Sequence, residues 1–335
     1  MDARKDRREF MKQSAAAAAA LTLGAGVARA QEAPAAAPVA APATVTGPSP
    51  SATPDAKLPT GTIAGMTVSR MLLGGNLLTH FTHSRDLQYV YNLCAHYNTD
   101  EKIIETMALA EDNGINTLSI HTVPRALATM REHRRRGGKM QWIVCPTAEI
   151  EPGLEKYRQQ VRELVDDGCE SIYLWGVRTD PMAAEGKMDL LAECVECAKE
   201  MGVPSGVGAH DLEAIKKCEE HKVPADFYIK TFHHHNYPSG PKRPEQLDGP
   251  YNEDPGYWCK SPQETIDVMS KVEKPWIAFK IMAAGAIPPK DAFQYVFDNG
   301  ADHALVGMFD FEIAEDASLM ANVLKSVNRT RAWRS

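Results

Sequence analysis

Lysine and histidine side chains stand at the ends of several short apolar runs, where they could transfer protons. Lys280 follows the apolar residues 276–279, and His210 and His121 each end a similar run. A lysine in an apolar setting has a lowered pKa, so it can act as a base, as a Schiff-base nucleophile or as a cation that holds an oxyanion. Histidine exchanges protons near neutral pH. We therefore take Lys280, His210 and His121 as the candidate catalytic residues.

Each of these residues also has a purely structural interpretation. Lys280 would be stable as a buried ion pair with Asp310 or Glu149, because buried lysines are rare unless they are paired or used. His210 and His121 would be ordinary hydrogen-bonded residues at a rim. The sequence leaves both interpretations open.

Polar and aromatic side chains near other apolar runs are candidates for binding a substrate. Residues 231–263 form a connection far longer than usual, and loops of that length commonly act as lids or binding walls. Aromatic faces together with polar groups suit a sugar or another polyol. The candidate substrate-binding residues are Asn76 (with His80 and His83 close behind it), Glu149, Trp175, His233, Tyr237, Trp258 and Asp310.

Glu149 and His210 are also candidate ligands of a divalent metal, together with one of His80, His121 or His233. A carboxylate combined with imidazole groups suits Zn²⁺ or Mn²⁺. Ligands gathered from separate strands leave no short spacing motif, and the sequence contains no H-E-x-x-H to fix the site. The cofactor is therefore unknown at this point, with a divalent metal as one candidate and NAD(P) as a less favoured one.

The elements that must position these residues alternate regularly along the chain. Short apolar runs are separated by segments with the spacing of amphipathic helices, several of which end in glycine. This alternation predicts parallel strands joined by right-handed crossovers, and eight such units close into an α/β fold, the (βα)8 barrel. The rival, an open doubly wound sheet, would need a glycine-rich nucleotide turn, of which residues 74–76 are only a fragment. The predicted strands are residues 71–76, 115–121, 140–146, 171–176, 203–210, 225–231, 276–282 and 303–309.

In such a barrel the active site lies at the carboxyl ends of the strands, which is where the candidate residues fall. The two-residue period of a strand predicts that Ile277 and Phe279 face the outer helices, and that Ala278 and Lys280 face the barrel axis. Lys280 is therefore expected inside the barrel.

Composition and charge exclude several classes of partner. The 335 residues carry a formal net charge of −7, so the chain lacks an extended basic surface for nucleic acid or anionic lipid. Only 7% of the residues are aromatic, which disfavours a base-stacking surface. The expected partner is a small, sugar-like substrate.

The first thirty residues resemble a twin-arginine export signal. Arg7-Arg8 precedes an alanine-rich apolar run, and Ala28-Arg29-Ala30 has the small-x-small pattern of a cleavage site. The apolar run is shorter than the roughly 20 residues that a spanning helix needs, so a stable membrane anchor is not expected. The resemblance implies contact with the twin-arginine translocase during export and a periplasmic or secreted location.

The composition divides the chain into three parts. Residues 1–30 form the expected signal peptide, and residues 31–59, which are rich in alanine and proline, form an expected disordered linker. Residues 60–330 form the expected barrel domain.

Four short stretches are similar to the aldo/keto reductase barrel. Residues 65–74 resemble its hairpin and first strand, residues 113–118 resemble the start of its second strand, and residues 274–285 and 304–308 resemble its seventh and eighth strands. The resemblance implies a (βα)8 fold and an NAD(P)-dependent reductase activity.

The catalytic tetrad of that family, Asp, Tyr, Lys and His, is not matched in this sequence. The second, third and fourth predicted strands end at His121, Thr147 and Trp175, where the family has Asp, Lys and His. No catalytic residue is therefore carried over from the family, and a periplasm that supplies no free nicotinamide cofactor also disfavours a reductase.

Three functions follow from these observations. Our first hypothesis is an exported enzyme that acts on a small sugar-like or carbonyl substrate by acid–base chemistry, of isomerase, epimerase or lyase type. In it, Lys280 stabilises or forms an enolate-like intermediate while His210 and His121 move protons. The alternatives are an aldo/keto-reductase-like NAD(P)-dependent oxidoreductase and a non-catalytic carbohydrate-binding barrel. The last predicts that the strand-end residues do not converge on a common point.

Overall fold

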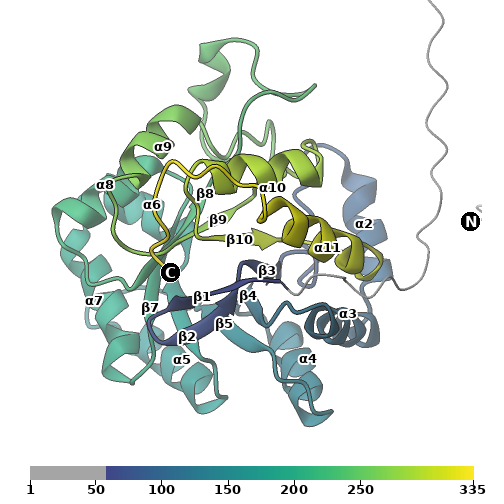
Figure 1. The fold of residues 1–335 in the computed structure, drawn as a ribbon. Coiled ribbons are helices and arrows are strands. Elements are labelled where there is room, and N and C mark those ends of the chain that lie inside the picture. Colours follow the sequence, from purple (N-terminus) through teal and green to yellow (C-terminus); the bar gives the residue numbers. More distant parts are fainter. Residues whose placement is uncertain (1–57) are drawn as a thin grey trace, which may run out of the picture. The chain divides into compact units, whose positions relative to one another are not determined.

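A computed structural model describes residues 58–335, and the expected signal peptide and nearly all of the expected linker lie outside the described residues. A two-stranded antiparallel hairpin comes first, formed by β1 (Thr60–Ile63) and β2 (Met66–Ser69). Eight parallel strands then close into a barrel in chain order, with the last strand beside the first (Figure 1). These strands are β3 (Met71–Gly74), β4 (Thr117–His121), β5 (Gln141–Cys145), β6 (Ser171–Leu174), β7 (Ser205–Ala209), β8 (Phe227–Thr231), β9 (Trp276–Phe279) and β10 (His303–Val306).

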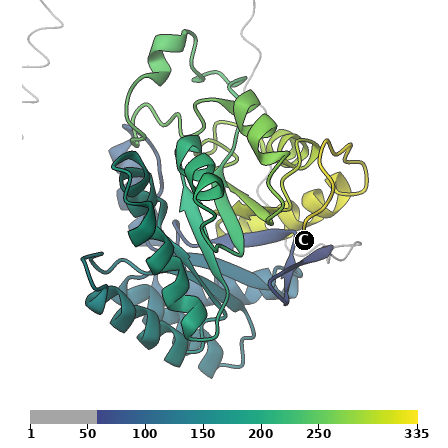
Figure 2. The ribbon, with the colours of Figure 1, turned by 90° about the vertical axis from the view of Figure 1, so that its left-hand side faces the viewer.

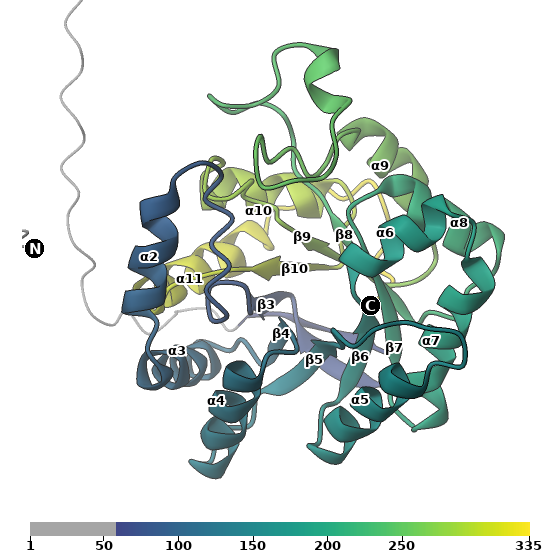
Figure 3. The ribbon, with the colours of Figure 1, turned by 180° about the vertical axis from the view of Figure 1, so that it is seen from behind.

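Each predicted apolar run contains one barrel strand, so the predicted (βα)8 architecture is confirmed. Helices surround the barrel and cover the outer faces of its strands (Figure 2, Figure 3). The α-helices are α2 (Gln88–Tyr97), α3 (Asp100–Asp112), α4 (Pro124–Arg135), α5 (Glu155–Asp166), α6 (Gly176–Ala184), α7 (Met188–Glu200), α8 (Leu212–Glu220), α9 (Pro262–Met269), α10 (Pro289–Asp298) and α11 (Ile313–Val323), and the 3-10 helices are η1 (Pro244–Leu247) and η2 (Asp310–Glu312).

Two apolar layers hold the barrel together. The larger layer lies between the strands and the outer helices, and the smaller one fills the barrel interior. Ile63 and Val68 of the hairpin belong to the interior layer, and the side chains of Asn116 and Gln141 donate to the backbone of Thr67. Because Asn116 and Gln141 lie where β4 and β5 begin, the hairpin closes the amino-terminal end of the barrel and leaves the carboxyl end for a site.

The predicted register of β9 is wrong. Ile277 and Phe279 pack in the barrel interior, whereas Ala278 packs in the layer beneath the helices. Strand alternation alone would therefore send Lys280 outward. Lys280 still lines the interior cavity because its backbone takes a left-handed conformation, with φ of 55°, which ends the alternation at that residue.

The long connection after β8 contains η1 and projects from the body of the barrel (Figure 1). Its later part returns to the carboxyl end of the barrel, where Tyr251, Glu253 and Trp258 contribute to a cavity wall. Over the described residues, no helix has both the length and the apolar character needed to cross a bilayer.

Candidate active site

A cavity of about 540 Å³ opens at the carboxyl end of the barrel. This volume is typical of sites for small molecules and cofactors. Residues that end or follow different strands form its wall, as barrel active sites require. Among the predicted site residues, those that line it are Asn76, His121, Trp175, His210, Trp258 and Lys280.

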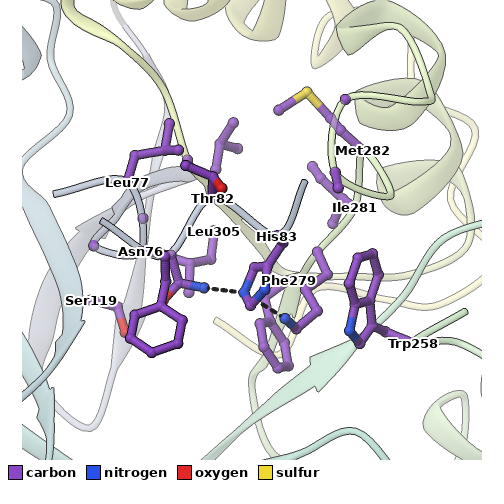
Figure 4. Close-up of a pocket in the computed structure, with 18 of the residues that line it drawn as sticks. Asn76, Leu77, Thr82, His83, Ser119, Trp258, Phe279, Ile281, Met282 and Leu305 are labelled. Carbon is purple, nitrogen blue, oxygen red and sulfur yellow. Dashed lines mark hydrogen bonds between the residues drawn. The ribbon is translucent and has the colours of Figure 1, made fainter. Parts of the chain in front are cut away.

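Lys280, His83 and Glu253 form a hydrogen-bonded array in this cavity. Figure 4 shows His83 at its centre, with the hydrogen bond to Asn76 drawn as a dashed line. His83 Nδ1 lies 2.5 Å from Glu253 Oε1, so Nδ1 carries the proton and donates it to the carboxylate. The other ring nitrogen, Nε2, is then an acceptor for Asn76 Nδ2 at 2.6 Å and for Lys280 Nζ at 2.7 Å. Glu253 thus sets the tautomer of His83, and His83 in turn fixes the direction of the lysine side chain.

The electrostatics of the array bring Lys280 close to its titration point at neutral pH. Burial lowers the pKa of Lys280 to about 7, and the negative charge of Glu253 opposes this only in part. Burial also lowers the pKa of His83, although the hydrogen bond to Glu253 raises it. Burial raises the pKa of Glu253, but its hydrogen bond from His83 and the charge of Lys280 outweigh this, so the pKa is lowered. Near pH 7 the array therefore holds an ionised carboxylate, a neutral imidazole and a lysine in both protonation states.

The aromatic ring of Trp258 also contacts the lysine, with Nζ 4.7 Å from the ring centroid. A cation at this distance over an indole face is attracted by the negative electrostatic potential of the ring. Trp258 therefore favours the charged form of Lys280 and opposes the effect of burial.

Strained backbone accompanies the array. Lys280 and His83 both have positive φ, and after β9 the consecutive residues Ala283, Ala284 and Gly285 do as well. The left-handed conformation costs about 1–2 kcal/mol for a residue other than glycine. Such strain clusters at functional sites, where the surrounding structure holds it in place.

A second group of polar atoms faces the cavity from β4. The ring of His121 stacks on that of Trp175, with centroids 6.0 Å apart and planes within 5°. His121 Nε2 and Ser119 Oγ are buried and have no hydrogen-bond partner among the described residues. Buried polar atoms nearly always have a partner, so these two atoms suit the polar groups of a bound molecule.

His210 stands on the opposite part of the wall and is held by Asp180. Its Nδ1 lies 2.9 Å from Asp180 Oδ2, and Asp180 also accepts the backbone N–H groups of His210 and Asp211. Burial lowers the pKa of His210, so the imidazole is neutral near pH 7. The hydrogen bond to Asp180 leaves Nε2 as an acceptor for a ligand.

Glu149 does not belong to the site, contrary to the sequence-based prediction. Its side chain is 70% exposed and forms an ion pair with Lys156. It therefore cannot share a metal ion with His210, which lines the cavity. Within residues 58–335 no group of three or more His, Cys, Asp or Glu side chains is placed to hold a metal, and His80 lies beside Arg125 instead.

Three further predicted residues lie outside the cavity wall. His233 is buried, and its Nε2 accepts the backbone N–H of Cys259. Tyr237 is buried beneath the long connection. Asp310 accepts hydrogen bonds from Lys102 and Tyr97 at the surface of the barrel. The ring of Tyr237 packs edge-on against that of His233, with the centroids 6.0 Å apart. A pattern of strand ends cannot reveal these contacts.

Sequence reasoning missed several residues that form the site. His83 was noted only as a neighbour of Asn76, and Glu253 and Asp180 were not selected at all. Glu253 lies 170 positions from His83 in the long connection, and Asp180 lies within a helix. The only sequence signal for Glu253 is its place in that unusually long loop.

No protein-family model and no curated protein matches this chain. Solved structures do. A Pseudomonas aeruginosa protein assigned to the aldo-keto reductases matches with a TM-score of 0.53 and 15% identity, over 82% of this chain and 100% of that one. The aldo-keto reductase AKR11C1 of Bacillus halodurans (holo form) has a TM-score of 0.51 and 10% identity, over 82% and 93%. A mutant of Gox0644 in complex with NADPH has a TM-score of 0.52 and 10% identity, over 81% and 89%.

These matches show the fold, which is a divergent aldo-keto-reductase-like (βα)8 barrel, as the four short stretches of sequence predicted. They overturn our first functional hypothesis. An isomerase, epimerase or lyase was favoured over a reductase, and the matching structures are aldo-keto reductases instead. The sequence hypothesis was wrong because it weighed the missing catalytic tetrad above the resemblance of the strands.

Proposed function

We propose that this chain is an oxidoreductase that interconverts a carbonyl and a hydroxyl group on a small polar substrate, with a nicotinamide dinucleotide as its cofactor. The observation that carries the proposal is the array of Lys280, His83 and Glu253 in the cavity of an aldo-keto-reductase-like barrel. None of its three residues stands at the strand ends where the family has Asp, Lys and His, so the geometry of the array itself must account for the chemistry.

Reduction of a carbonyl adds a hydride to carbon and a proton to oxygen. Lys280 supplies the proton, because its pKa of about 7 leaves the ammonium well populated at neutral pH and readily deprotonated. One N–H of Lys280 is directed at His83, which leaves two for the substrate oxygen. In the oxidation direction the neutral amine accepts the proton of the hydroxyl group.

His83 and Glu253 are positioning residues in this scheme. Glu253 holds the imidazole in one tautomer, and the imidazole holds the lysine. The negative charge of Glu253 also raises the pKa of Lys280 and so keeps the proton available. The substrate's other polar groups have His121 Nε2 and His210 as partners.

The residues present fit a nicotinamide dinucleotide. Its ring needs an apolar surface, which Phe279 and Trp258 offer, and its carboxamide needs hydrogen-bond partners, which Ser119 Oγ can supply. Its phosphates need N–H groups, and the backbone N–H groups of Ala284 and Gly285 border the cavity and donate to no other described group. When bound, the dinucleotide would supply the hydride.

A non-catalytic carbohydrate-binding barrel is a weaker explanation. That hypothesis predicts strand-end residues that do not converge. Lys280 lies 197 positions from His83 in the sequence, and yet its Nζ and Asn76 Nδ2 are both within hydrogen-bond distance of His83 Nε2. Binding alone gives no reason to place a lysine with a lowered pKa at this point.

The proposal is tested by mixing the purified full chain with reduced dinucleotide and a panel of small aldehydes, ketones and ketoses, while the absorbance of the reduced nicotinamide is followed. We expect turnover with at least one carbonyl compound and a loss of about 10²–10⁴-fold in kcat for Lys280→Met. Lys290→Met, at an exposed position ten residues further on, is the matched control. Absence of both dinucleotide binding and turnover would refute the proposal.

A further inference from the structure

Two carboxyl groups line the cavity on the side that follows β10. They belong to Glu312, at the end of η2, and Asp316, in the first turns of α11. The side chain of Asp316 is buried, with 6% of the residue exposed, and it makes no hydrogen bond to any described residue. One oxygen of Glu312 accepts the backbone N–H of Phe309 at 2.8 Å, and the other has no partner within the described part of the chain.

The surroundings of these carboxyl groups are acidic. The charged groups that act on Asp316 are Glu312 and Glu315, and together with burial they raise its pKa to about 7. Burial also raises the pKa of Glu312. Among residues 58–335, Lys280 is the only lysine or arginine that lines the cavity, and it is held in the array with His83. An anion placed near Asp316 would therefore meet no cation and two carboxyl groups.

This arrangement is the reverse of a phosphate site. Barrels that bind phosphates frequently hold them between the loops after the last two strands and the start of a short extra helix. In this chain that position is formed by the residues after β9 and β10 and by η2, and it carries Glu312 and Asp316. A carboxylate accepts hydrogen bonds from the hydroxyl groups of a ribose, whereas a cation such as arginine is needed to hold a ribose phosphate.

We propose that Asp316 and Glu312 bind the ribose hydroxyl groups of the dinucleotide and exclude a phosphate on that ribose, so that this chain takes NADH and rejects NADPH. The inference rests on the proposed function, because it concerns the cofactor of the same cavity. A preference for NADH would distinguish this chain from Gox0644, a structural neighbour whose mutant was solved with NADPH.

The test measures binding rather than turnover. The full chain is titrated separately with NADH and NADPH, and binding is followed by calorimetry or by the fluorescence of the reduced nicotinamide. At pH 8.5, where Asp316 is ionised, we expect NADPH to bind at least about 100-fold more weakly than NADH, because the phosphate on the ribose would face a carboxylate of like charge. The ratio of the NADPH to the NADH dissociation constant should fall by about tenfold or more in Asp316→Asn and in the double variant Glu312→Gln with Asp316→Asn. Both variants remove the repulsion and keep the shape of the side chains.

Glu273→Gln is the matched control, since Glu273 is exposed, does not line the cavity and is not among the charges that act on Asp316. It should leave the ratio unchanged. Equal or tighter binding of NADPH by the unaltered chain, or a ratio that the Asp316 and Glu312 variants do not change, would overturn the inference and leave the proposed function standing. If neither dinucleotide binds, the proposed function fails and this inference fails with it. Thermal unfolding confirms that the variants are folded, and the single and double variants provide independent tests.

Discussion

Replacing Lys280 by methionine should make the protein more stable in mildly acidic solution while it lowers kcat by about 10²–10⁴-fold. Methionine replaces the side chain as far as Cε and removes the charged nitrogen. Burial lowers the pKa of Lys280 from its ordinary value of 10.5 to about 7. Between these two pH values the unfolded chain binds one proton more than the folded chain, so the free energy of unfolding rises with pH across this window. Below pH 7 the folded state carries the full cost of the buried charge.

The size of the effect follows from the pKa difference. A shift of about 3.5 units corresponds to about 5 kcal/mol at 1.36 kcal/mol per unit. Lys280 is half-buried and faces an open cavity, where solvent screens part of this cost, so we halve the figure to about 2.5 kcal/mol. The loss of the hydrogen bond to His83 offsets about 1 kcal/mol. The net gain for Lys280→Met at pH 6 is therefore about 1.5 kcal/mol.

The assay is denaturant unfolding of the full chain at pH 6 and pH 10, with Lys290→Met as the control for loss of one exposed positive charge. Lys280→Met should be more stable than the unaltered protein at pH 6, and this advantage should disappear at pH 10, where Lys280 is already neutral. Kinetics on the unaltered protein should show carbonyl reduction declining as pH rises through about 7, since the proton donor is then lost. A variant that is less stable at pH 6, or whose stability varies with pH as in the unaltered protein, would refute the assignment of a lowered pKa to Lys280.

Glu253→Gln should move the decline in carbonyl reduction to lower pH, because the charge that raises the pKa of Lys280 is gone; an unmoved pH profile would contradict the positioning role. Glu149→Gln should leave turnover and metal content unchanged, because this side chain lies at the surface, and an altered kcat/KM would return it to the site. Ala284→Gly should raise the free energy of unfolding by about 0.5–1 kcal/mol in a denaturant titration, since glycine adopts positive φ without steric cost. Replacing both arginines of residues 7–8 by lysine should retain the precursor in the cytoplasmic fraction, and normal export would refute the twin-arginine assignment.

The fold was predictable because the barrel repeats one simple pattern. Each strand is buried on both faces, so it appears as a short apolar run, and each crossover helix shows a separate three-to-four spacing. Glycines at helix ends, such as Gly114 and Gly168, take the positive φ that a helix terminus requires. These signals are local, and eight repetitions of them indicate a closed parallel sheet.

The site was only partly predictable, because strand ends specify where a residue lies along the barrel and not what it contacts. Asn76, His121, Trp175 and His210 line the cavity as the positions of their strands suggested. Glu149 follows β5 and yet forms an ion pair with Lys156 at the surface, a contact that its place after a strand does not reveal. The partners that give the site its chemistry come from helices and loops with no periodic signal.

The case of Lys280 shows why the strand pattern alone could not give the site. The alternation places Ile277 and Phe279 in the interior, so an extended residue at the next position would point into the layer beneath the helices. The left-handed backbone at Lys280 reverses this direction and brings the ammonium group to His83. Lysine has no intrinsic preference for that conformation, so the packing of the barrel must impose it at a cost of about 1–2 kcal/mol. The same conformation occurs at Lys222, which does not line the cavity, so strain alone does not locate a site. At Lys280 it matters because it turns the ammonium group toward His83 at the carboxyl end of β9.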